Sequence, residues 1–202
     1  MYLIHPRRYY RNFKNKIEVL KLKRLAKEYG VELLLGSNIR IENCSISSNS
    51  EHGYPNSKLA IEDNCYLKCA HFGFYGENST ISIGAYTHTN GGEKSKVTFQ
   101  VGADSTINIG EECLFAGGVV LCTTDFHPVF NEQGERTNPN KDIFVNDHVW
   151  FARHAYINKG VTIGKNSIVG AHSVVSKSFM KENVVIVGNP ATIKKENIYW
   201  EE

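Results

Sequence analysis

The segment Thr124-Asp125-Phe126-His127-Pro128 holds the two side chains of this chain that are best suited to proton-transfer chemistry. Histidine gains and loses a proton near physiological pH, so its imidazole serves well as a general acid or base. Asp125 precedes His127 by two residues, and alternate residues share a face where a chain is extended. The carboxylate is therefore expected to orient the imidazole, to bind an acceptor, or simply to cap a turn.

The chain on both sides of this segment repeats every six residues. The longest unbroken run of aliphatic or aromatic residues at this spacing is Val145, Phe151, Ile157, Ile163, Val169 and Val175. A period of six fits neither a helix, with its period of 3.6, nor a plain strand. It predicts a triangular prism of stacked coils, each of about 18 residues, in which one short strand lies on every face.

The repeat stops at His127, which is the next position in phase after Ile109, Phe115 and Leu121. Continuing the count would place Gln133 and Pro139 in the core. Residues 127–144 are therefore predicted to be a loop inserted at one corner, and long loops in compact domains usually carry function. Because the repeat breaks at His127, its ring is expected to leave the core and face a groove.

These patterns predict three parts. Residues 1–34 comprise a basic, aromatic segment (1–11) and an amphipathic helix (12–29) that caps the open first coil, with Pro6 breaking any earlier helix. Residues 35–180 form the prism, although the repeat is loose before residue 109. Residues 181–202 form a last strand, a turn and a polar tail with at most a short helix.

Charge is distributed unevenly along this globular chain of 202 residues. The net charge is +2, yet residues 1–30 hold nine Lys or Arg and two Glu. Such a segment suits peripheral contact with a membrane surface, binding of an anionic polymer, or a merely solvated helix face. No nucleic-acid-binding motif accompanies it, and no stretch reaches membrane-spanning length. Five scattered cysteines indicate reduced thiols in a cytoplasmic protein.

Three motifs resemble those of the hexapeptide-repeat acyltransferases, a family with a left-handed parallel β-helix. They are Thr124–Pro128 with the loop after it, the run from Val149 to Lys177, and Gly188-Asn189-Pro190-Ala191. The resemblance covers residues 109–195 and is closest to the maltose/galactoside acetyltransferases and the O-acetyltransferases of capsule and surface polysaccharides. It implies left-handed coiling, against the usual crossover rule, and a homotrimer with sites between subunits.

The same resemblance implies transfer of an acetyl group from acetyl-CoA to a saccharide hydroxyl, without a metal. In the family, the histidine matched by His127 takes the proton of the attacking hydroxyl. Two alternatives remain open: a small-molecule acceptor, such as an antibiotic or a nucleotide-linked amino sugar, and a non-catalytic β-helix scaffold. A zinc-dependent carbonic anhydrase of the same fold is not favoured, because His148 and His154 lack a third partner.

Binding residues are expected where large or charged side chains point outward. Trp150, Phe126 and Tyr156 occupy the outward sixth position of their hexads, so they are predicted to line the acceptor or coenzyme groove or to pack between subunits. Asn90 is a further acceptor-binding candidate. The candidates for contact with coenzyme A, whose phosphates suit lysine, are Ser176, Lys177, Trp150, Ala152, Lys159 and Lys165. Ordinary surface lysines would give the same pattern.

Overall fold

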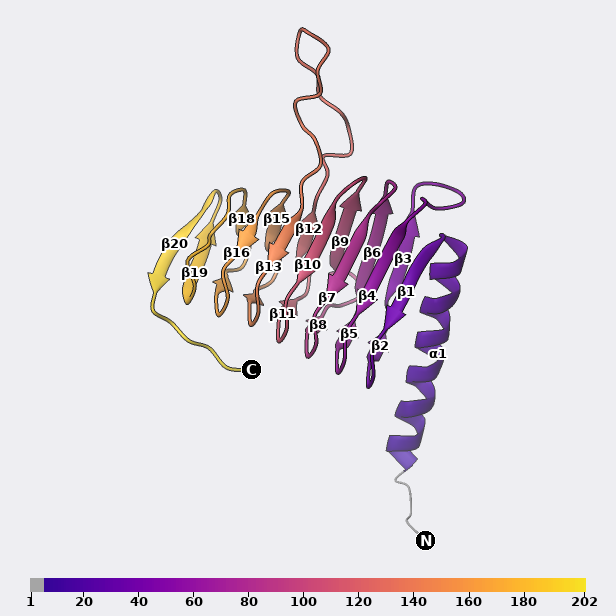
Figure 1. Cartoon of the computed structure of the whole chain (residues 1–202). Helices are drawn as coiled ribbons and strands as arrows, with labels where there is room; N and C mark the ends of the chain where they lie inside the picture. The colour runs from indigo at the N-terminus through magenta and orange to yellow at the C-terminus, as the bar shows by residue number, and fades with distance from the viewer. Residues whose placement is uncertain (1–5) are drawn as a thin grey trace.

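The computed structural model describes residues 6–202, with side chains from residue 12 onward. The predicted basic segment 1–11 therefore lies partly outside the described residues. The rest is a column of triangular coils with a helix across its N-terminal end (Figure 1). The three faces are sheets of six, eight and six strands. The predicted parallel β-helix is confirmed.

The chain visits the three sheets in turn. Sheet A contains β1 (Val31–Leu35), β4 (Ser57–Ile61), β7 (Thr80–Ile83), β10 (Thr106–Ile109), β13 (Ile143–Val145) and β16 (Thr162–Ile163). Sheet B contains β2 (Arg40–Glu42), β5 (Tyr66–Lys68), β8 (His88–Asn90), β11 (Leu114–Ala116), β14 (Trp150–Phe151), β17 (Ile168–Val169), β19 (Val184–Gly188) and β20 (Ala191–Glu196). Sheet C contains β3 (Ser45–Ser48), β6 (Ala70–Tyr75), β9 (Val97–Gly102), β12 (Val120–Cys122), β15 (Tyr156–Asn158) and β18 (Val174–Val175).

The column is left-handed. In Figure 1 the near strands of sheet A run downward and the far strands of sheet C run upward, while the chain advances from right to left. A coil that turns in this sense as it advances winds to the left. The handedness that the family resemblance implies is the one observed.

The repeat positions fill the interior. All six residues of the run from Val145 to Val175 are buried, and Trp150 pairs with Ile168 eighteen residues further on, which is one coil. Four buried phenylalanines stack along the column with ring centroids 4.6–5.6 Å apart: Phe72, Phe99, Phe115 and Phe151. The core is therefore one continuous pile of apolar side chains, not a channel.

Extra residues at the corners explain why the repeat is loose in the first half of the chain. His88 pairs with Leu114, 26 residues later, and Lys58 pairs with Thr80, 22 residues later. These coils exceed 18 residues because short loops are inserted at corners, which shifts the phase without disturbing the strands. The six-residue pattern is blurred at residues 71–76, yet all of these residues except Gly76 belong to the regular strand β6.

Asparagine and aspartate mark the corners. Asn56, Asn78 and Asp104 all have left-handed backbone angles (φ of 56°, 53° and 51°), which these short polar side chains tolerate. They also form a ladder between coils, since the Asn56 amide donates to Asn78 Oδ1 and the Asn78 amide donates to Asp104 Oδ1, both at 2.8 Å. This recurrence is a corner signal that the six-residue count does not use.

Helix α1 (Pro6–Glu28) covers the open edge of the first coil. Leu22 and Ala26 are buried against the coils. The Asn15 side chain donates to the Ile39 carbonyl (3.0 Å) and accepts from the Ile41 N–H (2.8 Å), so it replaces the missing strand neighbour of β2. The helix begins at Pro6, six residues before the predicted start at residue 12, because proline is well tolerated in the first turn of a helix.

The Asn15→Leu variant is expected to lose about 1–3 kcal/mol of unfolding free energy, because it leaves two backbone groups at the open edge without partners. Urea denaturation monitored by circular dichroism measures this loss. Asn12→Leu is the matched control, since Asn12 is exposed on the same helix and should change stability by less than about 0.5 kcal/mol. Equal effects of the two substitutions would contradict the edge-covering role.

The C-terminal segment closes the other end. β20 pairs antiparallel with β19, so the polar tail 192–202, for which the sequence allowed a short helix, begins as a strand. Gly188, with φ of 111°, permits the turn that brings the chain back. Beyond β20, Trp200 stacks on His148 with ring centroids 4.0 Å apart. Within residues 6–202, no helix combines the length and apolarity needed to cross a bilayer.

Candidate active site

The inserted loop leaves the column between sheets C and A and projects away from it (Figure 1). The Lys141 N–H donates to the Thr123 carbonyl (3.2 Å), which closes the base of the loop, and Phe130 pairs with Arg136 across its two arms. The loop therefore spans residues 124–140, not 127–144. The loop ends before residue 144, its predicted end, because Ile143 at the start of β13 is buried in the core.

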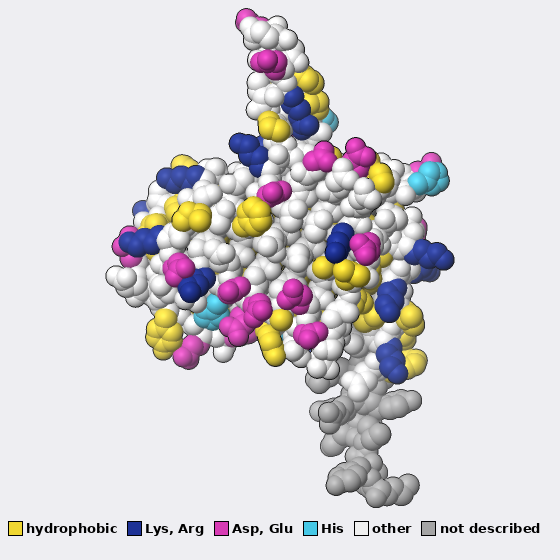
Figure 2. All heavy atoms as spheres, viewed as in Figure 1, with side chains coloured by type: hydrophobic (Ala, Val, Ile, Leu, Met, Phe, Trp, Pro, Cys, Tyr) yellow, Lys and Arg dark blue, Asp and Glu magenta, His cyan; other side chains and the backbone are white. Residues whose placement is uncertain are grey.

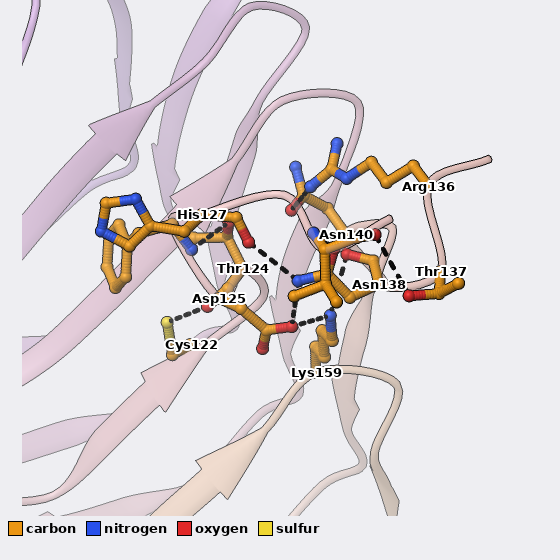
Figure 3. Close-up of polar contacts among 11 residues, drawn as sticks. Cys122, Thr124, Asp125, His127, Arg136, Thr137, Asn138, Asn140 and Lys159 are labelled. Carbon is orange, nitrogen blue, oxygen red and sulfur yellow. Dashed lines mark hydrogen bonds and ion pairs between the residues drawn. The ribbon is translucent and has the colours of Figure 1, made fainter. Parts of the chain in front are cut away.

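A closed polar network holds the two ends of the loop together where it leaves the column. The Asp125 carboxylate accepts from Lys159 Nζ and from the Asn138 amide (2.9 Å). Lys159 also donates to the Asn138 carbonyl (3.1 Å), and the Asn138 amide also donates to the His127 carbonyl (2.9 Å) (Figure 3). The hydrogen bond from Lys159 lowers the pKa of Asp125 below its usual range. The carboxylate is therefore ionised throughout the neutral range.

Asp125 does not face the imidazole of His127. Phe126 has a left-handed backbone with φ of 62°, so the segment turns where an extended conformation was expected. Figure 3 shows the Asp125 carboxylate directed toward Lys159 and the His127 ring directed to the opposite side. The prediction that Asp125 orients the ring from a shared face is wrong, and the carboxylate instead anchors the loop.

The turn places His127 in the open while its neighbours fix its backbone. The Phe126 N–H donates to Thr124 Oγ1 (3.0 Å), and the Phe126 ring packs edge-on against Tyr75, with centroids 4.9 Å apart. His127 itself is exposed. A fixed backbone that carries an accessible imidazole is the arrangement that a general base requires.

A hollow of about 440 Å³ lies beside this turn. Its lining residues are Cys122, Thr124, Asp125, Phe126, Tyr156, Asn158, Lys159 and Ser176. Burial raises the pKa of Tyr156 to about 12, so its hydroxyl stays protonated and can donate a hydrogen bond. Burial also raises the pKa of Cys122, which makes this thiol a poor nucleophile. The site therefore suits direct transfer of an acyl group from donor to acceptor better than transfer through an acyl group bound to Cys122.

Other predicted site residues lie on a different part of the column. Trp150 is in β14 on sheet B, with its ring centroid 6.0 Å from that of Trp200, and Ala152 follows the same strand. Asn90 ends β8, also on sheet B. A single chain therefore does not bring these three residues to His127, which stands between sheets C and A.

The three predicted lysines divide between two corners. Lys159 and Lys177 follow strands of sheet C one coil apart, at the corner that carries the loop, and Ser176 precedes Lys177 there. The ammonium of Lys177 lies 5.7 Å from the centroid of the Phe179 ring. Lys165 follows β16 of sheet A and faces Glu182 at 3.9 Å. Only the first two lysines are near the hollow, and Lys159 is already paired with Asp125.

Several residues of the site escaped the sequence analysis. Asn138 lies within the loop. Tyr75 comes from β6, which is two strands away in sheet C from β12, the strand that precedes the loop. Cys122 is buried, and its sulfur donates to the Thr124 carbonyl (3.0 Å) at the wall of the hollow. No sequence spacing points to these contacts, because they depend on the lengths of the corner insertions.

The described part of the chain contains no cluster of three or more His, Cys, Asp or Glu placed to hold a metal ion. His154 and His172, on successive coils, stack with centroids 5.0 Å apart. His148 contacts Asn166 (3.2 Å) and Trp200 instead.

With His127 as the expected general base, the Lys159→Met variant should lower kcat roughly 10- to 100-fold, because it frees the base of the loop and so displaces the turn that carries His127. The melting temperature should change little, since partly exposed ion pairs contribute at most about 1 kcal/mol. Lys159 could anchor the loop or contact a phosphate of the acetyl donor, and the KM for that donor distinguishes these roles. The KM should stay constant in Lys159→Met if the lysine only anchors the loop, and it should rise if the lysine contacts a phosphate. Steady-state kinetics measure both constants.

Lys181→Met is the matched control, because Lys181 pairs with Glu196 near the end of the column and should leave kcat unchanged. Combining Lys159→Met with Asp125→Asn should cost little more than either change alone, since both break the same contact. Additive losses would show that the two residues act separately.

Two family models match the chain. Residues 142–177 match "Bacterial transferase hexapeptide (six repeats)", and residues 10–112 match "Right handed beta helix region". The three sheets run without interruption through both regions, and the whole column is left-handed. The second match therefore reflects the stacking of parallel coils, not the direction in which they wind.

Proteins similar to this chain include named O-acetyltransferases. The polysialic acid O-acetyltransferase of Neisseria meningitidis is 36% identical over 162 residues, which cover 72% of this chain and 75% of that protein. The galactoside O-acetyltransferase of Escherichia coli (strain K12) is 32% identical over 137 residues, which cover 67% and 63%. The solved structure of the polysialic acid O-acetyltransferase OatWY superposes with a TM-score of 0.69 at 31% identity, over 85% of this chain and 87% of that one.

Proposed function

Because the chain belongs to the hexapeptide-repeat acetyltransferases, we propose that it transfers an acetyl group from acetyl-CoA to a hydroxyl of a saccharide. The proposed acceptor is a capsular or other surface polysaccharide, or its precursor. Both similar enzymes described above carry saccharide acceptors in their names. The observation that carries the proposal is the exposed imidazole of His127 on an anchored turn beside the hollow.

In the proposed mechanism, His127 accepts the proton of the acceptor hydroxyl as its oxygen attacks the thioester carbonyl. The tetrahedral intermediate then collapses, the carbon–sulfur bond breaks, and the imidazolium returns the proton to the departing thiolate of coenzyme A. General base catalysis of this kind contributes about 10²–10⁴-fold. Asp125, Lys159 and Asn138 act on the reaction only through the position of the turn.

Acetyl-CoA supplies the activated acyl group. At the corner that carries the loop, Ser176 and Lys177 are exposed and adjacent to the hollow, so they suit its polar and phosphate groups. Trp150 and Ala152 suit the same ligand only from another chain, because they lie on sheet B. Acetyl-CoA as donor and five free cysteines are both consistent with a cytoplasmic protein.

We further propose a homotrimer whose sites lie between subunits. Trp150 and Asn90 are on a different sheet from the corner of His127, so a site that uses all three needs residues from two chains. Co-expressing His127→Ala with Trp150→Ala should then restore activity that neither variant has alone, because mixed trimers contain some intact sites. Activity assays and light scattering of the mixed and separate variants measure this. Failure to complement in verified mixed trimers would place each site within one chain.

An acceptor screen tests the function. The purified chain is incubated with acetyl-CoA and, separately, polysialic acid, a galactoside, an uncharged polysaccharide, a nucleotide-linked amino sugar and an aminoglycoside. Thiol release is followed, and products are identified by mass spectrometry. Acetyl ester on a saccharide supports the proposal. Acetylation only of the amino sugar or the antibiotic would replace it with the small-molecule alternative, and no turnover at all would favour a scaffold.

A further inference from the structure

Helix α1 carries a second apolar stripe on the side opposite its buried face. Phe13, Ile17 and Leu20 expose 56%, 38% and 65% of their surface. Their spacing of four and three residues places them on one side of the helix. Leu22 and Ala26 fill the side that faces the coils. Because α1 lies across the end of the column (Figure 1), this second stripe points away from the molecule.

Basic side chains flank the stripe on both sides, and Arg24 ends it, four residues after Leu20 on the same side of the helix. Among the side chains of this helix that the structure describes, from residue 12 onward, the exposed lysines and arginine are Lys14, Lys16, Lys21, Lys23, Arg24 and Lys27. Figure 2 shows dark blue and yellow side chains interleaved over α1. Two acidic residues reduce this charge only in part: Glu18 accepts from Lys21 Nζ (3.0 Å) and from the Asn43 N–H (3.3 Å), and Glu28 is exposed at the C-terminal end of the helix. The outer face of α1 is therefore apolar along its centre and cationic along its rims.

We propose that this face of α1, from Phe13 to Lys27, docks on the surface of an anionic lipid bilayer. An amphipathic helix with these features lies in the interface, where its apolar side chains enter the acyl boundary and its cations meet lipid phosphates. The cations along the rims thus complement the negative charge of the lipid headgroups, and the apolar stripe matches the acyl boundary below them. The described helix is too polar to span a bilayer, so contact is peripheral.

An anionic polysaccharide fits this surface less well. It would satisfy the lysines, but a hydrated polymer offers no apolar phase for Phe13 and Leu20. The inference does not depend on the identity of the acceptor. The loop with His127 projects from the middle of the column, away from the end that α1 covers (Figure 1). Docking through α1 therefore leaves the candidate active site accessible.

Vesicle flotation with the full chain tests the proposal, with vesicles of phosphatidylcholine alone or mixed with phosphatidylglycerol. The wild type should float with the mixed vesicles, less with pure phosphatidylcholine, and less at high salt. Leu20→Glu should weaken partitioning more than about tenfold, because it places a charge in the apolar stripe. The double variant Lys23→Gln/Lys27→Gln should weaken it roughly fivefold for each charge removed.

Two matched controls lie at the other end of the column. Met180→Glu changes an exposed apolar residue, and Lys194→Gln/Lys195→Gln removes two exposed charges. Both should bind vesicles like the wild type. All variants should keep the wild-type circular dichroism spectrum and acetyl transfer to a soluble acceptor, which separates docking from catalysis.

Four results would overturn the proposal. The first is absence of flotation of the wild type with anionic vesicles. The second is binding that Met180→Glu weakens as much as Leu20→Glu does. The third is that the wild type does not bind vesicles and that Leu20→Glu changes the oligomeric mass measured by light scattering. This result would make the stripe an interface between copies. Retention of the wild type on a soluble anionic polysaccharide, in the absence of vesicle binding, would equally reassign the surface to the polymer.

Discussion

The His127→Ala variant is expected to lose about two to four orders of magnitude in kcat while it keeps its fold. The imidazole is exposed and makes no contact on which the turn depends, because Asn138 holds the turn through the His127 carbonyl. Removing the ring therefore removes the base and leaves the backbone in place. Thiol release from acetyl-CoA measures kcat, and the KM for acetyl-CoA should be unchanged because proton abstraction does not bind the donor.

His52→Ala is the control for this prediction, since His52 is another exposed histidine, in a loop of the first coils. It should retain wild-type activity.

The pH profile adds a separate test. The pKa of Asp125 lies below its ordinary value, so its carboxyl does not titrate between about pH 5 and 8. Any acid limb in that range should persist in Asp125→Asn, and near-normal turnover by His127→Ala would refute the mechanism.

The largest expected effect on stability belongs to Phe115→Ala, which should lose about 3–5 kcal/mol of unfolding free energy. Phe115 is fully buried and stacks on Phe151 with centroids 4.6 Å apart, and it also contacts Phe99 at 5.6 Å. Truncation leaves a cavity in a pile of rings that the flanking coils hold apart through their strand hydrogen bonds. Guanidinium unfolding at one fixed protein concentration measures the loss.

Phe144→Ala provides the comparison, because Phe144 is an exposed ring on the outer face of sheet A. Its removal should change stability by less than about 0.5 kcal/mol. Phe115→Leu should fall between the two, since leucine fills part of the cavity. A small loss in Phe115→Ala would mean that the coils collapse freely around a void, contrary to a close-packed column.

The sequence by itself determined the architecture, because the pattern of inward residues is periodic. Every sixth residue from Val145 to Val175 is apolar, and the structure buries each of them. The outward position of Trp150 and Tyr156 follows from the same count, as does the departure of a loop near His127. The amphipathic pattern of residues 12–29 also identified the capping helix, which buries Leu22 and Ala26. A repeat fixes which way a side chain faces, since neighbouring coils must stack in register.

Tertiary structure alone decided how the site residues meet. The orientation of Asp125 depends on the left-handed angle of Phe126 and on Lys159, which lies 34 residues further along the chain. Whether a lysine stands beside the loop, like Lys159, or at another corner, like Lys165, depends on the side of the prism that its strand occupies. A count of six residues specifies inside and outside, but corner conformations and insertion lengths set which outside residues become neighbours.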